Sequence, residues 1–179
     1  QEFKPFADEI NDHLRHYRTW THILLYGGET MIGIQNIGVY IPENYISNYD
    51  RKVQHDIDDN FIKHKIGVEK VTRKSPDEET SDLCIQAYQC LADKENIAIE
   101  EIDCIVVCTQ NPDGHGIPHT SAIVHSKLNA KEDCACFDIS LGCSGYVYSL
   151  SIMKSFMEAN GLQKGLLFTA DPYSKIINE

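Results

Sequence analysis

The chain has few basic residues for its acidic content: 16 Lys and Arg stand against 27 Asp and Glu in 179 residues, a formal net charge of −11. Nucleic acid is therefore not an expected partner, because binding to phosphate backbones depends on clustered Lys and Arg. No apolar run is long enough to cross a bilayer, and no secretory signal pattern opens the sequence. We expect a globular cytoplasmic protein with neither nucleic acid nor membrane as a partner.

Cysteine pairs with zinc-ligand spacing are also missing, because none of the seven cysteines forms a Cys-x-x-Cys pair. Six of them form three pairs, one in a predicted helix and two in predicted apolar strands. None of these segments has the flanking loops of a secreted domain held together by disulfides. The pairs are Cys84 and Cys90, Cys104 and Cys108, and Cys134 and Cys136. They are predicted to be small core residues in a reducing compartment.

One segment, residues 113–119 (DGHGIPH), has side chains that bind metals in other proteins. Its glycines and its proline instead predict a loop that leads into a helix. We therefore expect no metal site there.

Alternating apolar patterns predict the fold class. Strands are expected at 32–41, 102–108, 134–139 and 165–170, where continuous apolar runs suit a sheet covered on both faces. Helices are expected at 80–94, 118–128 and 144–159. The first begins with polar residues able to cap it, and the last is apolar nearly all round and is expected to be buried. This order predicts a layered α/β domain with a largely parallel sheet.

The run from Phe137 to Tyr146 (FDISLGCSGY) predicts a strand, a tight turn of small residues and a helix, with Cys143 at the helix N-terminus. The unpaired first-turn amides and the helix dipole stabilise a thiolate there, which favours a nucleophilic role for Cys143. Its own N–H is placed to begin an oxyanion hole. Gly142 and Gly145 leave room for an incoming carbonyl and for close strand–helix packing. The alternative for this cysteine alone is a buried structural residue.

That turn and five other segments, in order, resemble the N-terminal half of 3-oxoacyl-acyl carrier protein synthase III, the ketoacyl synthase III family of the thiolase-like superfamily. The matching segments are 32–42 (IGIQNIGVYIP), 59–68, 76–82, 102–107, 137–146 and 169–175. The resemblance covers residues 31–179. It implies the N-terminal half of a thiolase-like fold, a layered α/β domain with a largely parallel mixed sheet and a buried central helix after the nucleophile.

The resemblance also implies a chemistry. In a condensing enzyme of fatty acid or polyketide initiation, Cys143 would take an acyl group from an acyl-CoA primer, and malonyl-acyl carrier protein would then lose CO2 and attack that thioester. No metal or organic cofactor is required. The family's catalytic His and Asn belong to its second half, so this chain is expected to be a fragment that is inactive alone. The alternative is a thiolase-like acyltransferase, or a subunit of a heterodimeric synthase, without condensing activity.

Three further positions are weaker candidates for substrate binding by the same resemblance. Phe61 and Lys65 occupy places where CoA-using relatives often have a tryptophan that stacks on adenine and a nearby basic residue. Ile117 stands where the family has a residue that reaches across the dimer into the neighbour's pocket. Each of the two hydrophobic residues could instead be an ordinary anchor, Phe61 in the core and Ile117 in its loop.

Assembly is predicted from the apolar strand around residues 165–169, which has few charged residues to protect an exposed edge. The resemblance implies that this strand pairs with its two-fold mate, giving a homodimer.

Residues 1–30 lie outside the resemblance. Met31 directly precedes the family's opening strand and is interpreted as the native initiator. Residues 1–30 are then translated leader sequence, or else a true N-terminal extension that packs on the domain of residues 31–179.

Overall fold

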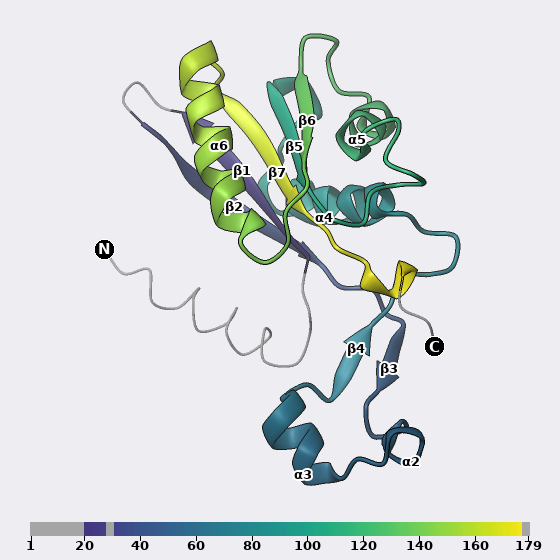
Figure 1. Ribbon diagram of the computed structural model, residues 1–179. Helices are drawn as coiled ribbons and strands as arrows, with labels where there is room; N and C mark the ends of the chain where they lie inside the picture. The colour runs from purple at the N-terminus through teal and green to yellow at the C-terminus, as the bar shows by residue number, and fades with distance from the viewer. Residues whose placement is uncertain (1–19, 28–30, 177–179) are drawn as a thin grey trace. The chain divides into compact units, whose positions relative to one another are not determined.

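The computed structural model describes residues 20–27 and 31–176, with side chains from residue 31 onward (Figure 1). The described residues divide into two compact units: residues 20–27 and 31–40 with 76–176, and residues 41–75. Each unit is described by itself below.

The larger unit is built on a five-stranded sheet of order β2-β1-β7-β5-β6. Its strands are β1 (Trp20–Gly27), β2 (Ile32–Tyr40), β5 (Cys104–Cys108), β6 (Ala135–Ile139) and β7 (Lys164–Thr169). Strand β5 pairs in parallel with β6 and β7, whereas β1 is antiparallel to both β2 and β7. The predicted mixed, largely parallel sheet is confirmed.

Helices cover both faces of this sheet (Figure 1). On one face lie α4 (Thr80–Glu95) and α5 (Thr120–Leu128), and on the other lies α6 (Gly145–Asn160). Alternate side chains of β5 point to opposite faces, as a strand requires. Ile105 and Val107 join the core under α4 and α5, while Val106 packs with Met153 and Met157 of α6. The unit is therefore a three-layer α/β/α sandwich.

A glycine on β7 lets α6 approach the sheet closely. A Cβ on Gly165 would overlap the side-chain ends of Met153 and Met157. Both methionines are wholly buried. The tight packing of α6 on β7 thus depends on the missing side chain at this position.

Helix α5 starts later than predicted, whereas α4 starts at Thr80 as predicted, and an aspartate distant in sequence contacts the first turn of each helix. Helix α5 begins at Thr120 rather than at residue 118, because Asp138 accepts hydrogen bonds from the Thr120 and Ser121 amides at 2.8 Å each. At the start of α4, Asp113 accepts from the Ser81 amide at 2.8 Å. Aspartates distant in sequence therefore hold first-turn amides of both helices.

The predicted free edge at residues 165–169 is wrong. Strand β7 lies inside the sheet between β1 and β5, and the edge strands are β2 and β6. The position beside β7 is occupied by β1, with Ile23 opposite Leu167. This strand comes from the segment 1–30 and was not predicted. Residues 1–19 and 28–30 lie outside the described residues, and the leader interpretation stays a prediction.

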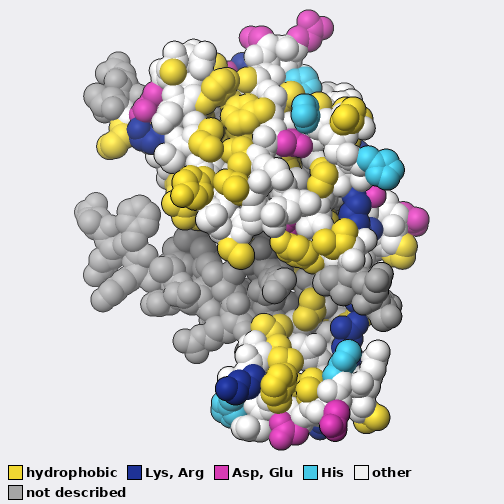
Figure 2. Space-filling model, in the orientation of Figure 1, with side chains coloured by type: hydrophobic (Ala, Val, Ile, Leu, Met, Phe, Trp, Pro, Cys, Tyr) yellow, Lys and Arg dark blue, Asp and Glu magenta, His cyan; other side chains and the backbone are white. Residues whose placement is uncertain are grey.

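The outward face of α6 is not buried in these residues, contrary to the prediction. Val147, Tyr148 and Ile152 are 66%, 58% and 43% exposed. Figure 2 shows hydrophobic side chains gathered on this side of the larger unit. The sheet covers only the opposite face of the helix, and nothing among the described residues covers this one.

The smaller unit contains a two-stranded antiparallel sheet and three short helical segments. Its strands are β3 (Tyr45–Ser47) and β4 (Lys70–Thr72), and its helices are α2 (Lys52–His55), α3 (Asp59–Phe61) and the π-helix η1 (Ile62–Ile66). Asp58 caps α3 by accepting from the Phe61 amide at 2.7 Å.

Two 3-10 turns complete the larger unit, η2 (Ile99–Glu101) and η3 (Tyr173–Lys175).

Candidate active site

Cys143 lies in the connection from β6 to α6. The Gly145 amide donates to the Gly142 carbonyl at 2.7 Å, which closes a tight turn around the cysteine. Helix α6 then begins at Gly145, with Ser144 as its N-cap. The predicted order of strand, small-residue turn and helix is confirmed.

Cys143 is the one exposed cysteine of the seven, all of which lie in the described part of the chain. Its backbone N–H donates to no acceptor among the described residues. A side chain at this place can react with a dissolved substrate, and its free amide precedes the positive end of a 16-residue helix. The arrangement suits a nucleophile whose amide stabilises a developing oxyanion.

Burial keeps other thiols of the chain protonated. It raises the pKa of Cys104 to about 12 and that of Cys134 to about 11, from an ordinary value of 9.0. The pKa of the Cys84 thiol is raised well above that value, again mainly by burial. These three cysteines are buried core residues, as predicted, and they are poor nucleophiles near neutral pH.

Gly145 is small because a thiol lies directly beneath it. A Cβ on Gly145 would be 2.5 Å from the Cys108 sulfur at the end of β5. The Cys108 thiol in turn donates to the Leu141 carbonyl at 3.5 Å. The requirement for close strand–helix packing at this glycine is therefore confirmed.

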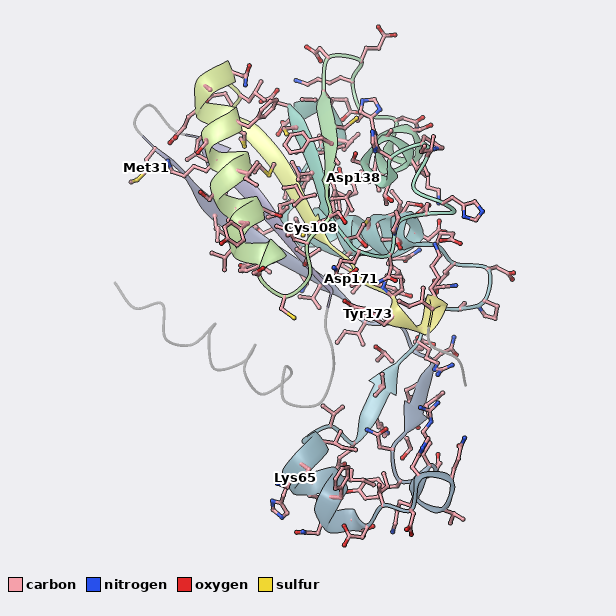
Figure 3. The ribbon with its side chains drawn as sticks, viewed as in Figure 1. Met31, Lys65, Cys108, Asp138, Asp171 and Tyr173 are labelled. Carbon is pink, nitrogen blue, oxygen red and sulfur yellow. The ribbon has the colours of Figure 1, made fainter. Side chains whose placement is uncertain are left out.

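Aspartates near the carboxyl ends of the strands hold the surrounding loops. Asp138 near the end of β6 and Asp113 after β5 hold the starts of α5 and α4, as described above. Asp171, just after β7, accepts at 2.7 Å from the Gln110 amide and at 3.0 Å from the Asn111 side chain. Figure 3 shows Asp171 and Tyr173 beyond the end of β7. These carboxylates form part of the scaffold around the Cys143 turn.

The weaker candidates lie in two different units. Phe61 is 44% exposed and its neighbour Ile62 is wholly buried, so Ile62, and not Phe61, anchors this helix in the core. Lys65 is also exposed, in the π-helix that follows (Figure 3). Ile117 belongs to the larger unit and is 90% exposed, so it does not anchor its loop in the core of the described residues. The substrate-binding roles of all three stay predictions.

Sequence reasoning missed Gln110 and Tyr173. The Tyr173 hydroxyl donates to Gln110 Oε1 at 2.9 Å, and the Gln110 amide lies against Gly142, directly before Cys143. A signal was available, because Gln110 follows the apolar run of β5 as Cys143 follows that of β6. Parallel strands end at the same edge of a sheet, where α/β proteins place their sites.

The three-layer α/β/α sandwich, with a cysteine turn at the carboxyl ends of its parallel strands, is the thiolase-like fold. A crystal structure of 3-oxoacyl-(acyl-carrier-protein) synthase III has a TM-score of 0.75 at 27% identity, covering 87% of this chain and 44% of that one. The synthase III from Thermus thermophilus has a TM-score of 0.72 at 32% identity, covering 79% and 43%. MvaS in complex with 3-hydroxy-3-methylglutaryl coenzyme A, at 19% identity and a TM-score of 0.70, is similar in fold alone.

Sequence comparison finds similarity to the synthase III family. A family model for 3-oxoacyl-[acyl-carrier-protein (ACP)] synthase III matches residues 137–179, which contain Cys143. The beta-ketoacyl-[acyl-carrier-protein] synthase III of Caldanaerobacter subterraneus subsp. tengcongensis is 36% identical over 82% of this chain. That of Helicobacter hepaticus is 34% identical over 84%. The predicted likeness to the ketoacyl synthase III family is thus confirmed in sequence and fold. The chain spans 44% and 45% of these two relatives.

Proposed function

We propose that these residues are part of a condensing enzyme that starts fatty acid or polyketide chains, with Cys143 as its acyl-carrying nucleophile. One observation carries the proposal. The exposed cysteine directly before helix α6, whose amide has no partner among the described residues, lies inside the segment that the synthase III family model matches.

In the first step the Cys143 thiolate attacks the thioester carbonyl of an acyl-CoA primer. The carbonyl oxygen gains the negative charge, and the free Cys143 N–H supports it. The intermediate collapses, the bond to the CoA sulfur breaks, and CoA leaves as a thiolate that takes up the proton released when Cys143 ionised. The acyl group is then held as a thioester, and covalent capture divides one difficult condensation into two easier steps.

In the second step malonyl-acyl carrier protein loses CO2, and the enolate formed attacks the Cys143 thioester carbonyl. A carbon–carbon bond forms, the bond to the Cys143 sulfur breaks, and the product is a 3-oxoacyl thioester on the carrier protein. Decarboxylation needs donors aimed at the malonyl thioester oxygen. We assign that role to a His and an Asn in a part of the protein beyond these residues.

We also propose a cytoplasmic homodimer. The edge strand β6 supports it, because each of its five residues is only partly buried and its outer side pairs with no strand among the described residues. An exposed edge with the sequence ACFDI favours pairing with a second copy. No helix in the described part of the chain is long and apolar enough to cross a membrane.

The test is a condensation assay with full-length protein, an acyl-CoA primer and radiolabelled malonyl-acyl carrier protein. We expect a 3-oxoacyl product from the wild type and none from Cys143→Ala, whereas Cys90→Ala, away from the turn, keeps full activity. Acyl transfer to Cys143 without any condensation would favour the acyltransferase alternative. Condensation by Cys143→Ala would refute the proposal.

A further inference from the structure

The Gln110 side chain is held against the backbone that leads into Cys143. Its Oε1 lies 2.8 Å, its carboxamide carbon 3.4 Å and its Nε2 3.8 Å from the place where a Cβ would stand on Gly142. The amide therefore occupies the space that the glycine leaves open. Any larger residue at Gly142 would displace it.

Two sets of contacts fix Gln110 in this place. Its backbone N–H donates to Asp171 at 2.7 Å, and its Oε1 accepts from the Tyr173 hydroxyl at 2.9 Å. The Lys175 ammonium adds a bond to the Pro112 carbonyl at 2.5 Å. These hydrogen bonds, with that from the Asn111 side chain to Asp171, tie the loop after β5 to the turn after β7.

The bond from Tyr173 determines which way the Gln110 amide faces. Because Oε1 accepts from Tyr173, the Nε2 group is turned away from it, and a primary amide has two N–H donors there. Among the described residues, Nε2 has no acceptor. Gln110 is exposed, so these donors are open to a dissolved molecule.

We propose that Gln110 is a substrate-binding residue that donates a hydrogen bond from Nε2 to a carbonyl oxygen of the thioester substrate at Cys143, and that Tyr173 is the positioning residue that orients it. The inference rests on the proposed function. A carboxamide is neutral and does not release its proton, so Gln110 orients the substrate and does not act as an acid. A carbonyl oxygen is the acceptor that such a donor suits.

The experiment compares two reactions of Cys143 in the full-length protein. One is acylation by an acyl-CoA, which presents carbonyl oxygens. The other is reaction with methyl methanethiosulfonate, a thiol reagent without a carbonyl group. The variants are Gln110→Leu and Tyr173→Phe, and Gln89→Leu on α4 is the matched control at another exposed glutamine.

We expect Gln110→Leu to slow acylation roughly 3- to 10-fold, the usual range for one lost hydrogen bond, chiefly by raising KM. Tyr173→Phe slows it less, and the double variant no more than Gln110→Leu. All variants react with methyl methanethiosulfonate at the wild-type rate, and Gln89→Leu matches wild type in both reactions.

Unchanged acylation of Gln110→Leu overturns the proposal. Equal loss in both reactions also overturns it, because Gln110 would then only support the turn. A wild-type protein that reacts with methyl methanethiosulfonate but accepts no acyl group refutes the proposed function and this role with it. Normal wild-type acylation, with no effect of the Gln110 change, refutes the Gln110 role alone.

Discussion

The sulfur of Cys108 lies beneath Gly145, so close that a Cβ on this glycine would be 2.5 Å away. Strand β5 and the first residue of α6 are thus fitted to each other directly behind Cys143. We expect Gly145→Ala to destabilise the full-length protein by roughly 1–3 kcal/mol, the usual cost of overpacking, and to slow acylation of Cys143. Denaturant unfolding and the acylation rate measure the two effects.

Two further variants test the cause. Cys108→Ala removes the crowding sulfur, so the double variant with Gly145→Ala should regain part of the stability that Gly145→Ala loses, while the contact of the added Cβ with the Leu141 Cβ, at 3.0 Å, remains. Gly33→Ala on β2 is the matched control, because an added Cβ there meets none of the described side chains within 4 Å. If Gly145→Ala and Gly33→Ala unfold alike, the packing explanation is wrong.

Asp138 holds the start of α5 through the Thr120 and Ser121 amides. Asp138→Ala leaves both first-turn donors unpaired and should lower the free energy of unfolding by about 1–2 kcal/mol, as for a lost helix cap. Asp138→Asn, which keeps one acceptor oxygen, should lose less. Asp133→Ala is the control, since its side chain is 82% exposed. Equal stability of Asp138→Ala and Asp133→Ala would count against the capping role.

The buried thiols predict a loss of stability at alkaline pH. The pKa of Cys104 is about 12 and that of Cys134 about 11, above the ordinary value of 9.0. Above about pH 9 the unfolded chain therefore releases thiol protons that the folded chain keeps, and the free energy of unfolding falls. The contribution is complete below about pH 9 and is lost as pH rises toward about 12. Unfolding midpoints at about pH 8 and about pH 10.5 measure it.

Cys104→Ala should flatten this pH dependence, because it removes one of the buried thiols whose pKa is raised in the folded protein. A slope that Cys104→Ala does not alter would assign the effect to other groups.

The sequence predicted the layered sheet because its central strands are buried on both faces and read as continuous apolar runs, as in Cys104–Cys108. It also predicted the Cys143 turn, because glycines at positions 142 and 145 indicate places where a side chain would be too crowded. The sequence did not predict features that depend on contacts between residues far apart in the chain. The capping of α5 by Asp138 and the placing of β1 beside β7 depend on tertiary neighbours that no local pattern encodes.

The contact between Tyr173 and Gln110 illustrates the same limit. The two residues are 63 positions apart and meet only because β5 and β7 are parallel neighbours. Exposure of the outer face of α6 was misjudged for another reason. An apolar pattern on all sides is typical of a covered helix, but it does not say which residues cover Val147 and Ile152, and none of the described residues does.

Residues 1–179 expressed alone should not condense malonyl-acyl carrier protein with any primer, since donors for decarboxylation are assigned to another part of the protein. The exposed apolar side chains Val147, Tyr148 and Ile152 should also bind a hydrophobic dye or promote aggregation. A condensation assay beside the full-length protein measures the first effect, and dye fluorescence the second. Equal turnover by both proteins would place the catalytic groups within these residues.

The central claim is that Cys143 is the residue that carries the acyl group. It is tested most directly by incubating full-length protein with an acyl-CoA, without malonyl-acyl carrier protein, and locating the adduct by peptide mass spectrometry. We predict one acyl group per chain on Cys143, none on Cys84, Cys104 or Cys134, and no adduct in a Cys143→Ser variant that unfolds like the wild type. An acyl group on another cysteine, with Cys143 dispensable, would contradict the account.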